Sequence, residues 1–290
     1  MKEPPFLLRD ATIAVVGLGL MGGSLAMALR ARKACRKILG ITRNAAARQA
    51  ALSGAIVDAA SADLTLAAEA DVIIMAAPVR TILEQLPQVG TIVREGAIIM
   101  DLGSTKLEIT RAMEGLPAHV EPIGAHPMCG KETFGFDAAD ADLYRNAVFV
   151  LTPLARTSAS SLALAESLAV TIGARPIVLD AARHDKIVAA ISHLPFALAA
   201  TLMTTADELA HADDLLYVLA ASGFRDTSRL AAGDATMMLD ILLTNHENVA
   251  AALRVYAHHL DELAELIDRQ DEIALRAILQ DAAMKRRQLF

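Results

Sequence analysis

The stretch Gly17-Leu18-Gly19-Leu20-Met21-Gly22 follows an apolar run, Thr12–Val16, and precedes a segment of helical character at residues 24–31. In a strand–turn–helix setting, the first glycine allows a tight turn and the second lets the backbone approach a pyrophosphate. The third glycine lets the helix pack closely on the strand. The start of the helix adds free N–H groups and a partial positive charge. The stretch therefore predicts a dinucleotide-binding turn formed by Gly17, Gly19, Leu20, Met21 and Gly22.

Around this turn, short apolar segments alternate with helical ones through the first part of the chain. The apolar segments lie at residues 38–41, 71–76, 97–100, 120–124, 147–151 and 177–179. Near-continuous apolar strands separated by helices are typical of a parallel sheet that is covered on both faces. The sequence therefore predicts an α/β fold with a doubly wound Rossmann domain over residues 1–180.

The pattern changes after residue 180, where no convincing strand follows. Residues 184–203 have a helical pattern, with Pro195 as an expected kink. From residue 234 to 270 apolar residues recur at steps of three and four, and a continuous helix of that length would span roughly 55 Å. A small domain can hardly cover such a helix, so we expect residues 181–290 to form an all-helical substrate and dimerisation domain, completed by a second subunit in a homodimer.

Composition excludes several classes of function. The 290 residues carry a net charge of −7, which disfavours a nucleic-acid partner and means that an anionic substrate needs local cations. The two cysteines provide neither a disulfide framework nor a four-cysteine zinc site, and we expect no metal. The chain shows no signal peptide and no apolar run of about 18 residues, so we expect a cytoplasmic protein that has no membrane partner.

The end of the second predicted strand bears on the choice of dinucleotide. An acidic residue there would bind the ribose 2′-hydroxyl of NAD, but this chain has Thr42 and Arg43 instead. Thr42 can donate a hydrogen bond to a 2′-phosphate, and Arg43 can form a charge-assisted pair with it. Alternatively, Arg43 stacks on adenine or faces solvent. The pattern favours NADP, with NAD as the alternative.

Four further segments contain residues suited to chemistry. DLGSTK (101–106) and AHPMCG (125–130) each follow a predicted strand, where this fold class binds ligands. ISHLP (191–195) and SGFRDTSR (222–229) lie in the helical part. Together with GLGLMG, in this order, the set resembles the prephenate/arogenate dehydrogenase family of tyrosine biosynthesis, and the resemblance covers nearly the whole chain.

The resemblance implies an oxidative decarboxylation. A hydride leaves the ring carbon that bears the 4-hydroxyl for the nicotinamide, a base takes the hydroxyl proton, and the ring carboxylate departs as CO2. His126 matches the family's catalytic histidine, and an ordinary histidine pKa suits a base at neutral pH. Ser104 matches the serine that orients this histidine and the hydroxyl. Its alternative role, compatible with the first, is to cap the following helix.

The resemblance also implies the residues that bind the substrate. Arg225 matches the arginine that binds the ring carboxylate, for which a bidentate guanidinium is suited. His193 matches a histidine near the substrate side chain, although by itself it would be interpreted as a core histidine. Lys106 and Glu132 are expected to border the pocket, where Glu132 could meet the ammonium of arogenate or belong to a polar loop. Cys129 is interpreted as a packing residue, because hydride transfer needs no covalent step.

Two other functions are compatible with parts of the sequence. A β-hydroxyacid dehydrogenase would also combine a glycine turn with a helical domain, but it needs a lysine in a glycine-rich helix, and Lys186 has no such glycines around it. A non-catalytic, dimeric NADP-binding sensor would have no need for His126, Ser104 and Arg225 together. The motifs therefore favour the dehydrogenase of prephenate or arogenate.

Overall fold

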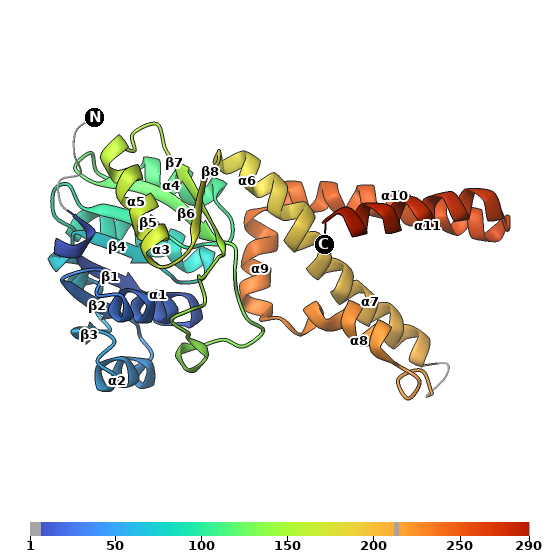
Figure 1. The fold of residues 1–290 in the computed structure, drawn as a ribbon, viewed down its shortest axis with the longest axis horizontal. Coiled ribbons are helices and arrows are strands. Elements are labelled where there is room, and N and C mark those ends of the chain that lie inside the picture. Colours follow the sequence, from blue (N-terminus) through green and yellow to red (C-terminus); the bar gives the residue numbers. More distant parts are fainter. Residues whose placement is uncertain (1–6, 212–214, 290) are drawn as a thin grey trace.

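A computed structural model describes residues 7–211 and 215–289 of the chain. It shows a sheet domain from which two helical arms diverge (Figure 1). The eight strands of the sheet have the order β3-β2-β1-β4-β5-β6-β7-β8. Their bounds are β1 Thr12–Val16, β2 Lys37–Ile41, β3 Ala59–Ser61, β4 Val72–Met75, β5 Ile98–Asp101, β6 Glu121–Pro127, β7 Val148–Pro153 and β8 Arg175–Val178.

Helices cover both faces of this sheet, as the apolar strands predict. One core lies between the sheet and helices α1 and α5, and the other lies between the sheet and helices α3 and α4. The strands β1 and β4 are buried throughout. The helices of this domain are α1 Leu20–Ala31, α2 Ala45–Ser53, α3 Val79–Ile92, α4 Leu107–Glu114 and α5 Ala159–Thr171, with short turns η1 Leu8–Asp10, η2 Leu64–Glu69 and η3 Phe136–Ala138. The doubly wound α/β fold is thereby confirmed.

The direction of the last two strands differs from the expectation of a wholly parallel sheet. Strand β7 pairs antiparallel with β6, and β8 runs parallel to β7. The connection at residues 128–147 contains only the short η3 turn and no crossover helix. A parallel neighbour requires such a crossover, whereas an antiparallel one does not.

The helical part begins at Ala181, just after β8, so we keep residue 180 as the proposed domain boundary. The expected kink at Pro195 is instead a π-helical turn that ends before it, and Pro195 lies in the first turn of α7. The expected long helix is broken at Asn245, between α9 and α10. The elements are α6 Ala181–Val188, η4 Ala189–His193, α7 Leu194–Ala210, α8 Ser222–Ser228, η5 Arg229–Ala232, α9 Ala235–Thr244, α10 His246–Asp268 and α11 Glu272–Leu289.

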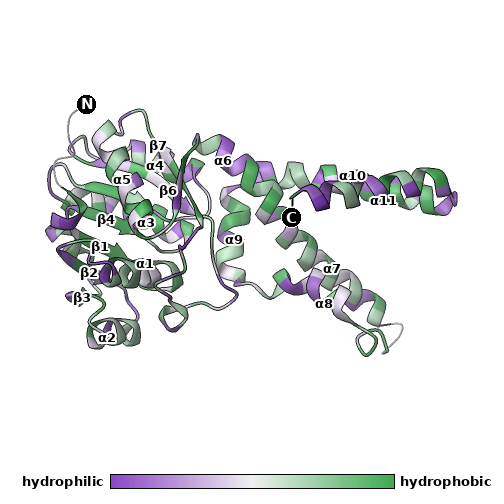
Figure 2. Ribbon diagram, in the orientation of Figure 1, coloured by the Kyte–Doolittle hydropathy of each residue, from purple (hydrophilic) through white to green (hydrophobic). Residues whose placement is uncertain are grey.

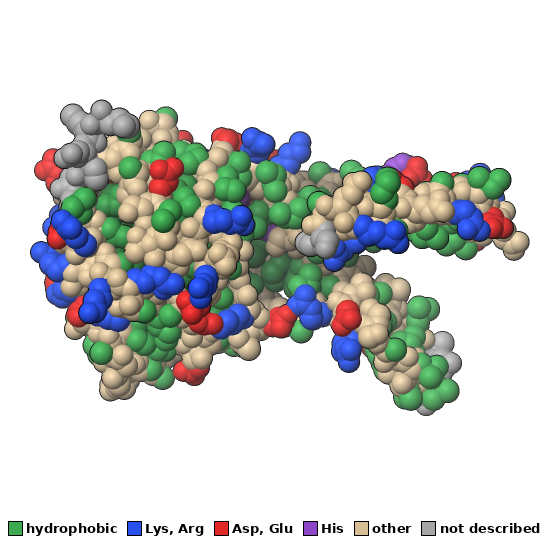
Figure 3. All heavy atoms as spheres, viewed as in Figure 1, with side chains coloured by type: hydrophobic (Ala, Val, Ile, Leu, Met, Phe, Trp, Pro, Cys, Tyr) green, Lys and Arg blue, Asp and Glu red, His purple; other side chains and the backbone are tan. Residues whose placement is uncertain are grey.

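Hydrophobic residues recur along both arms (Figure 2), and the space-filling view shows apolar side chains at the surface of each arm (Figure 3). Val218 is 74% exposed on one arm and Ile273 is 85% exposed on the other. By length and composition alone, the helical segment Ala181–Ala210 could cross a membrane. It also carries His184, Asp185 and His193, which are buried at the candidate site described below.

Candidate active site

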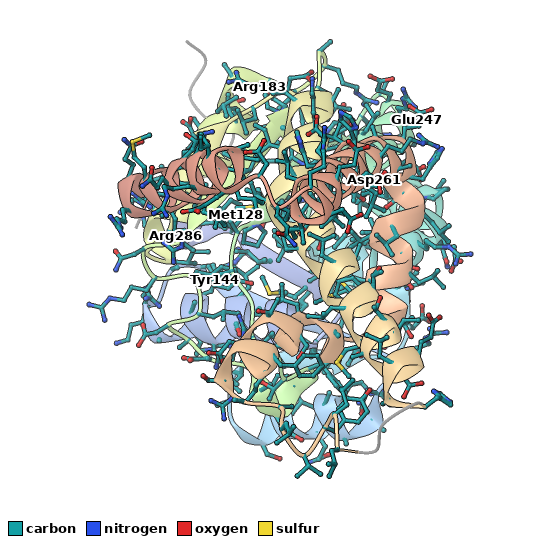
Figure 4. All side chains as sticks on the ribbon, turned by 90° about the vertical axis from the view of Figure 1, so that its right-hand side faces the viewer. Met128, Tyr144, Arg183, Glu247, Asp261 and Arg286 are labelled. Carbon is teal, nitrogen blue, oxygen red and sulfur yellow. The ribbon has the colours of Figure 1, made fainter. Side chains whose placement is uncertain are left out.

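A cavity of about 710 Å³ lies between the carboxyl ends of the strands and the helical part. The surface is hollowed where the arms leave the sheet domain (Figure 3). Met128, which lines the cavity, lies near the centre of the molecule when it is viewed along the arms (Figure 4). Among the predicted site residues, those that line the cavity are Gly19, Leu20, Met21, Ser104, His126, Glu132 and His193.

The glycine turn has the geometry that a dinucleotide phosphate needs. Gly17 has a φ of +102°, and a Cβ atom there would lie 2.5 Å from the carbonyl oxygen of Ala76. A Cβ at Gly22 would lie 1.9 Å from the carbonyl oxygen of Gly17, so helix α1 packs directly on the turn. Gly19 has open space beside it, and no side chain caps the start of α1. Backbone N–H groups at this helix end can therefore receive a phosphate.

Thr42 and Arg43 lie just after β2, outside the lining of the cavity. Arg43 is exposed and Thr42 is half-buried. The carbonyl oxygen of Thr42 accepts a hydrogen bond of 2.6 Å from Nη1 of Arg48. The Arg48 guanidinium therefore lies at this end of β2, next to Thr42.

His126, on strand β6, is held by a chain of side chains from helix α6. Its Nδ1 lies 2.9 Å from Nε2 of His184, and Nδ1 of His184 lies 2.8 Å from Oδ1 of Asp185. Both α6 side chains are 1% exposed. Burial, reinforced by His184, Lys106 and His193, holds the pKa of His126 well below its ordinary value. The neutral, proton-accepting form of His126 is therefore favoured.

Asp185 also joins the two domains. Its carboxylate accepts hydrogen bonds from the backbone N–H groups of Lys106, at 2.7 Å, and Leu107, at 2.9 Å. These N–H groups lie at the start of α4, so a residue of α6 caps a helix of the sheet domain. Ser104 lies in the loop before this helix and faces the cavity without capping α4 itself.

Lys106 does not border the cavity, which corrects the expectation from the sequence. It is fully buried and paired with the carboxylate of Asp101. Burial lowers the pKa of Lys106 and raises that of Asp101, while the contact between them opposes both shifts. The ammonium also donates a 2.6 Å hydrogen bond to the carbonyl oxygen of Ala125. Lys106 thus supports the backbone directly before His126.

The structure likewise does not bring Arg225 to the cavity. The Arg225 side chain is 78% exposed, and its Nε lies 3.7 Å from Asp226. Arg229 is the arginine of this motif that contacts the cavity lining, because it pairs with Glu132. This pair also links the loop after β6 to the helical part.

His193 lies in the π-helical turn and is 1% exposed. Its Nδ1 is 3.2 Å from Nδ2 of Asn245, which donates a 2.7 Å hydrogen bond to the carbonyl oxygen of Asp185. Burial lowers the pKa of His193 to about 4, so it is neutral at physiological pH. Cys129 is half-buried, and burial raises its pKa to about 11, consistent with a packing role.

Sequence reasoning missed His184, Asp185, Asn245 and Arg229 as candidate site residues. The signal for the first two is an adjacent histidine and aspartate at the start of an otherwise apolar helical segment. Asn245 interrupts the apolar pattern where α9 gives way to α10.

The fold and site together define a nucleotide-binding dehydrogenase with a helical second domain. Residues 25–178 match the sequence profile described as "Prephenate dehydrogenase, nucleotide-binding domain". Residues 180–281 match "Prephenate dehydrogenase, dimerization domain". The chain therefore belongs to the prephenate dehydrogenase family, whose oxidative decarboxylation serves tyrosine biosynthesis. This membership disfavours the β-hydroxyacid dehydrogenase and sensor alternatives.

Relatives in sequence and structure agree with this assignment. The prephenate dehydrogenase of Lactococcus lactis is 37% identical over 93% of this chain and 75% of its own length. The structure of prephenate dehydrogenase from A. aeolicus, in complex with hydroxyphenyl propionate and NAD+, has a TM-score of 0.91 at 29% identity and covers 100% of both chains. Synechocystis arogenate dehydrogenase has a TM-score of 0.82 at 34% identity, covering 96% of this chain and 100% of its own.

Proposed function

We propose that this protein oxidises and decarboxylates prephenate, arogenate or both with a nicotinamide dinucleotide, and that the cavity between the domains is its active site. The observation that carries the proposal is that the glycine turn and His126 line one cavity. Relatives with similarity over most of the chain carry the names of both prephenate and arogenate dehydrogenases.

His126 is the proposed base. Its Nδ1 is engaged with His184, so Nε2 is the atom left to accept the proton of the substrate hydroxyl. Ser104, on the same cavity, orients that hydroxyl. When bound, the nicotinamide supplies the hydride acceptor. The buried Lys106–Asp101 pair keeps the backbone at Ala125 in place, so that the His126 ring is presented in one orientation.

The proposed substrate contacts follow from charge. Arg229, in place of Arg225, binds a substrate carboxylate, because it is the guanidinium that pairs with a residue of the cavity lining. Glu132 is suited to the ammonium of arogenate. His193 is neutral, so it offers a hydrogen bond to the substrate side chain without repelling or attracting a charge.

NADP is the proposed cofactor, and NAD is the alternative. Thr42, Arg43 and Arg48 lie together at the end of β2, where a 2′-phosphate needs cationic and hydroxyl partners. The A. aeolicus relative was crystallised with NAD+, so the KM values for NAD and NADP are the quantities to compare in this protein.

Dimerisation is part of the proposal. The second domain matches a profile described as a dimerization domain, and the arms expose apolar side chains that a second copy would cover.

A two-by-two assay tests the proposed function. Prephenate and arogenate are each tried with NAD and NADP, and the absorbance of the reduced cofactor is followed. We expect turnover of at least one substrate and a lower KM for NADP than for NAD. The absence of turnover in all four combinations would overturn the function, and a lower KM for NAD would overturn the cofactor preference.

A further inference from the structure

Three titratable side chains form a line that leads away from the cavity. His126 faces the cavity, His184 lies behind it, and Asp185 lies behind His184, with heavy-atom distances of 2.9 and 2.8 Å along the line. The two rings meet edge to face, with centroids 5.0 Å apart. His184 and Asp185 are 1% exposed. Solvent therefore does not compete for the hydrogen bond between His184 and Asp185.

The position of each proton along this line follows from Asp185. Each oxygen of its carboxylate already accepts a backbone N–H group at the start of α4. An ionised carboxylate only accepts hydrogen bonds, so Nδ1 of His184 must be the protonated nitrogen that donates to it. In a neutral imidazole the other nitrogen is then an acceptor. Nε2 of His184 therefore accepts a hydrogen bond from Nδ1–H of His126.

We propose that His184 is a positioning residue that fixes His126 in the tautomer with a proton on Nδ1 and a free lone pair on Nε2. The inference rests on the proposed function, in which Nε2 faces the substrate hydroxyl. The alternative tautomer would carry its proton on Nε2 and could not act as the base.

The same three side chains also respond to the positive charge that the reaction creates on His126. When the substrate O–H bond breaks, a new N–H bond forms at Nε2 of His126, and the ring becomes positive. Burial disfavours a charge on this ring, and a positive charge on His184, Lys106 or His193 adds to that cost. A neutral His184, oriented by Asp185, instead accepts the hydrogen bond from Nδ1–H of His126, and this bond becomes charge-assisted and offsets part of the cost. The proton transfer itself requires no other reactant.

Two substitutions of His184 separate these roles. In His184→Gln the amide oxygen can still accept from Nδ1 of His126, whereas in His184→Leu nothing can. We expect His184→Leu to lower kcat about 100-fold, with the KM and the cofactor Kd changed less than about threefold, and His184→Gln to recover about a tenth or more of the wild-type kcat. His119→Leu is the matched control, because His119 is a half-buried histidine just before β6, at the end of that strand opposite to His126.

The tautomer itself is measured without substrate. Nitrogen NMR of histidine-labelled protein, with the His126 signals assigned by their loss in His126→Asn, should show a proton on Nδ1 of His126 in the wild type and in His184→Gln. In His184→Leu the tautomers should mix. A wild-type His126 protonated on Nε2, or a His184→Leu variant with wild-type kcat and tautomer, would overturn the inference. Failure of the proposed function would appear separately, as a wild type without turnover.

Discussion

Replacing Arg229 by alanine should lower kcat/KM for prephenate far more than replacing Arg225 by alanine, although the two residues are only four positions apart. The Arg229 guanidinium pairs with Glu132, a residue of the cavity lining. The Arg225 side chain is 78% exposed and lies near Asp226. The comparison therefore asks which of two chemically identical side chains binds the substrate carboxylate.

The expected magnitude follows from the exposure of each group. The side chains of Arg229 and Glu132 are 56% and 66% exposed, so losing their pair should cost the fold no more than about 1 kcal/mol. A hydrogen bond to a charged group contributes about 1.5–3 kcal/mol. At about 1.36 kcal/mol for each factor of ten, kcat/KM for prephenate should fall about 10- to 150-fold in Arg229→Ala. Arg225→Ala should change it less than about threefold.

The assay follows reduced-cofactor absorbance at saturating cofactor over a range of prephenate concentrations, with thermal unfolding measured on the same samples. Arg225→Ala is the matched control, since it removes the same charge from the same segment. A 10-fold or larger decrease of kcat/KM in Arg225→Ala, with wild-type kcat/KM and stability in Arg229→Ala, would refute the assignment of Arg229.

Three further outcomes are expected. His126→Asn should lower kcat at least about 100-fold and leave the cofactor Kd, measured by fluorescence titration, unchanged. Because the pKa of His126 is lowered, kcat/KM of the wild type should decrease at acid pH only below pH 6.5. A decrease that begins above pH 6.5 would contradict a neutral base. Glu132→Gln should lower kcat/KM for arogenate relative to prephenate, and an unchanged ratio would remove Glu132 from specificity. Lys106→Met should cost about 3–5 kcal/mol in chemical denaturation, because it leaves Asp101 buried and unpaired, and Asp101→Asn in the same chain should restore part of that loss.

Most of the sheet domain could be predicted because its signals are local. A buried strand needs a short run of apolar residues, and the glycine turn needs three glycines at fixed spacing. The reversal of β7 could not be predicted this way, because strand direction depends on the path of residues 128–147. The short strand β3 was missed as well, since Ala59–Ser61 contains no large apolar side chain.

The candidate site was predicted in part for a similar reason. Ser104 and His126 follow from motifs at strand ends, where the topology alone directs them to one edge of the sheet. Arg225 and Arg229 belong to one motif, but the chain changes from an α-helix to a 3-10 turn at Arg229. Which arginine reaches the cavity is therefore set by helix phase and domain packing. Lys106 was wrongly predicted to border the pocket, because the sequence does not show that it forms a buried ion pair with Asp101, five residues earlier.

The position of the Asp185 carboxylate between the two domains limits how the protein can be divided or recombined. It belongs to the helical part, yet it caps α4 of the sheet domain and orients the histidine behind His126. A sheet domain expressed alone would lose this cap and the side chains that hold His126. The two halves are therefore not interchangeable modules, and a chimera with a foreign helical half would need an acidic residue at this position.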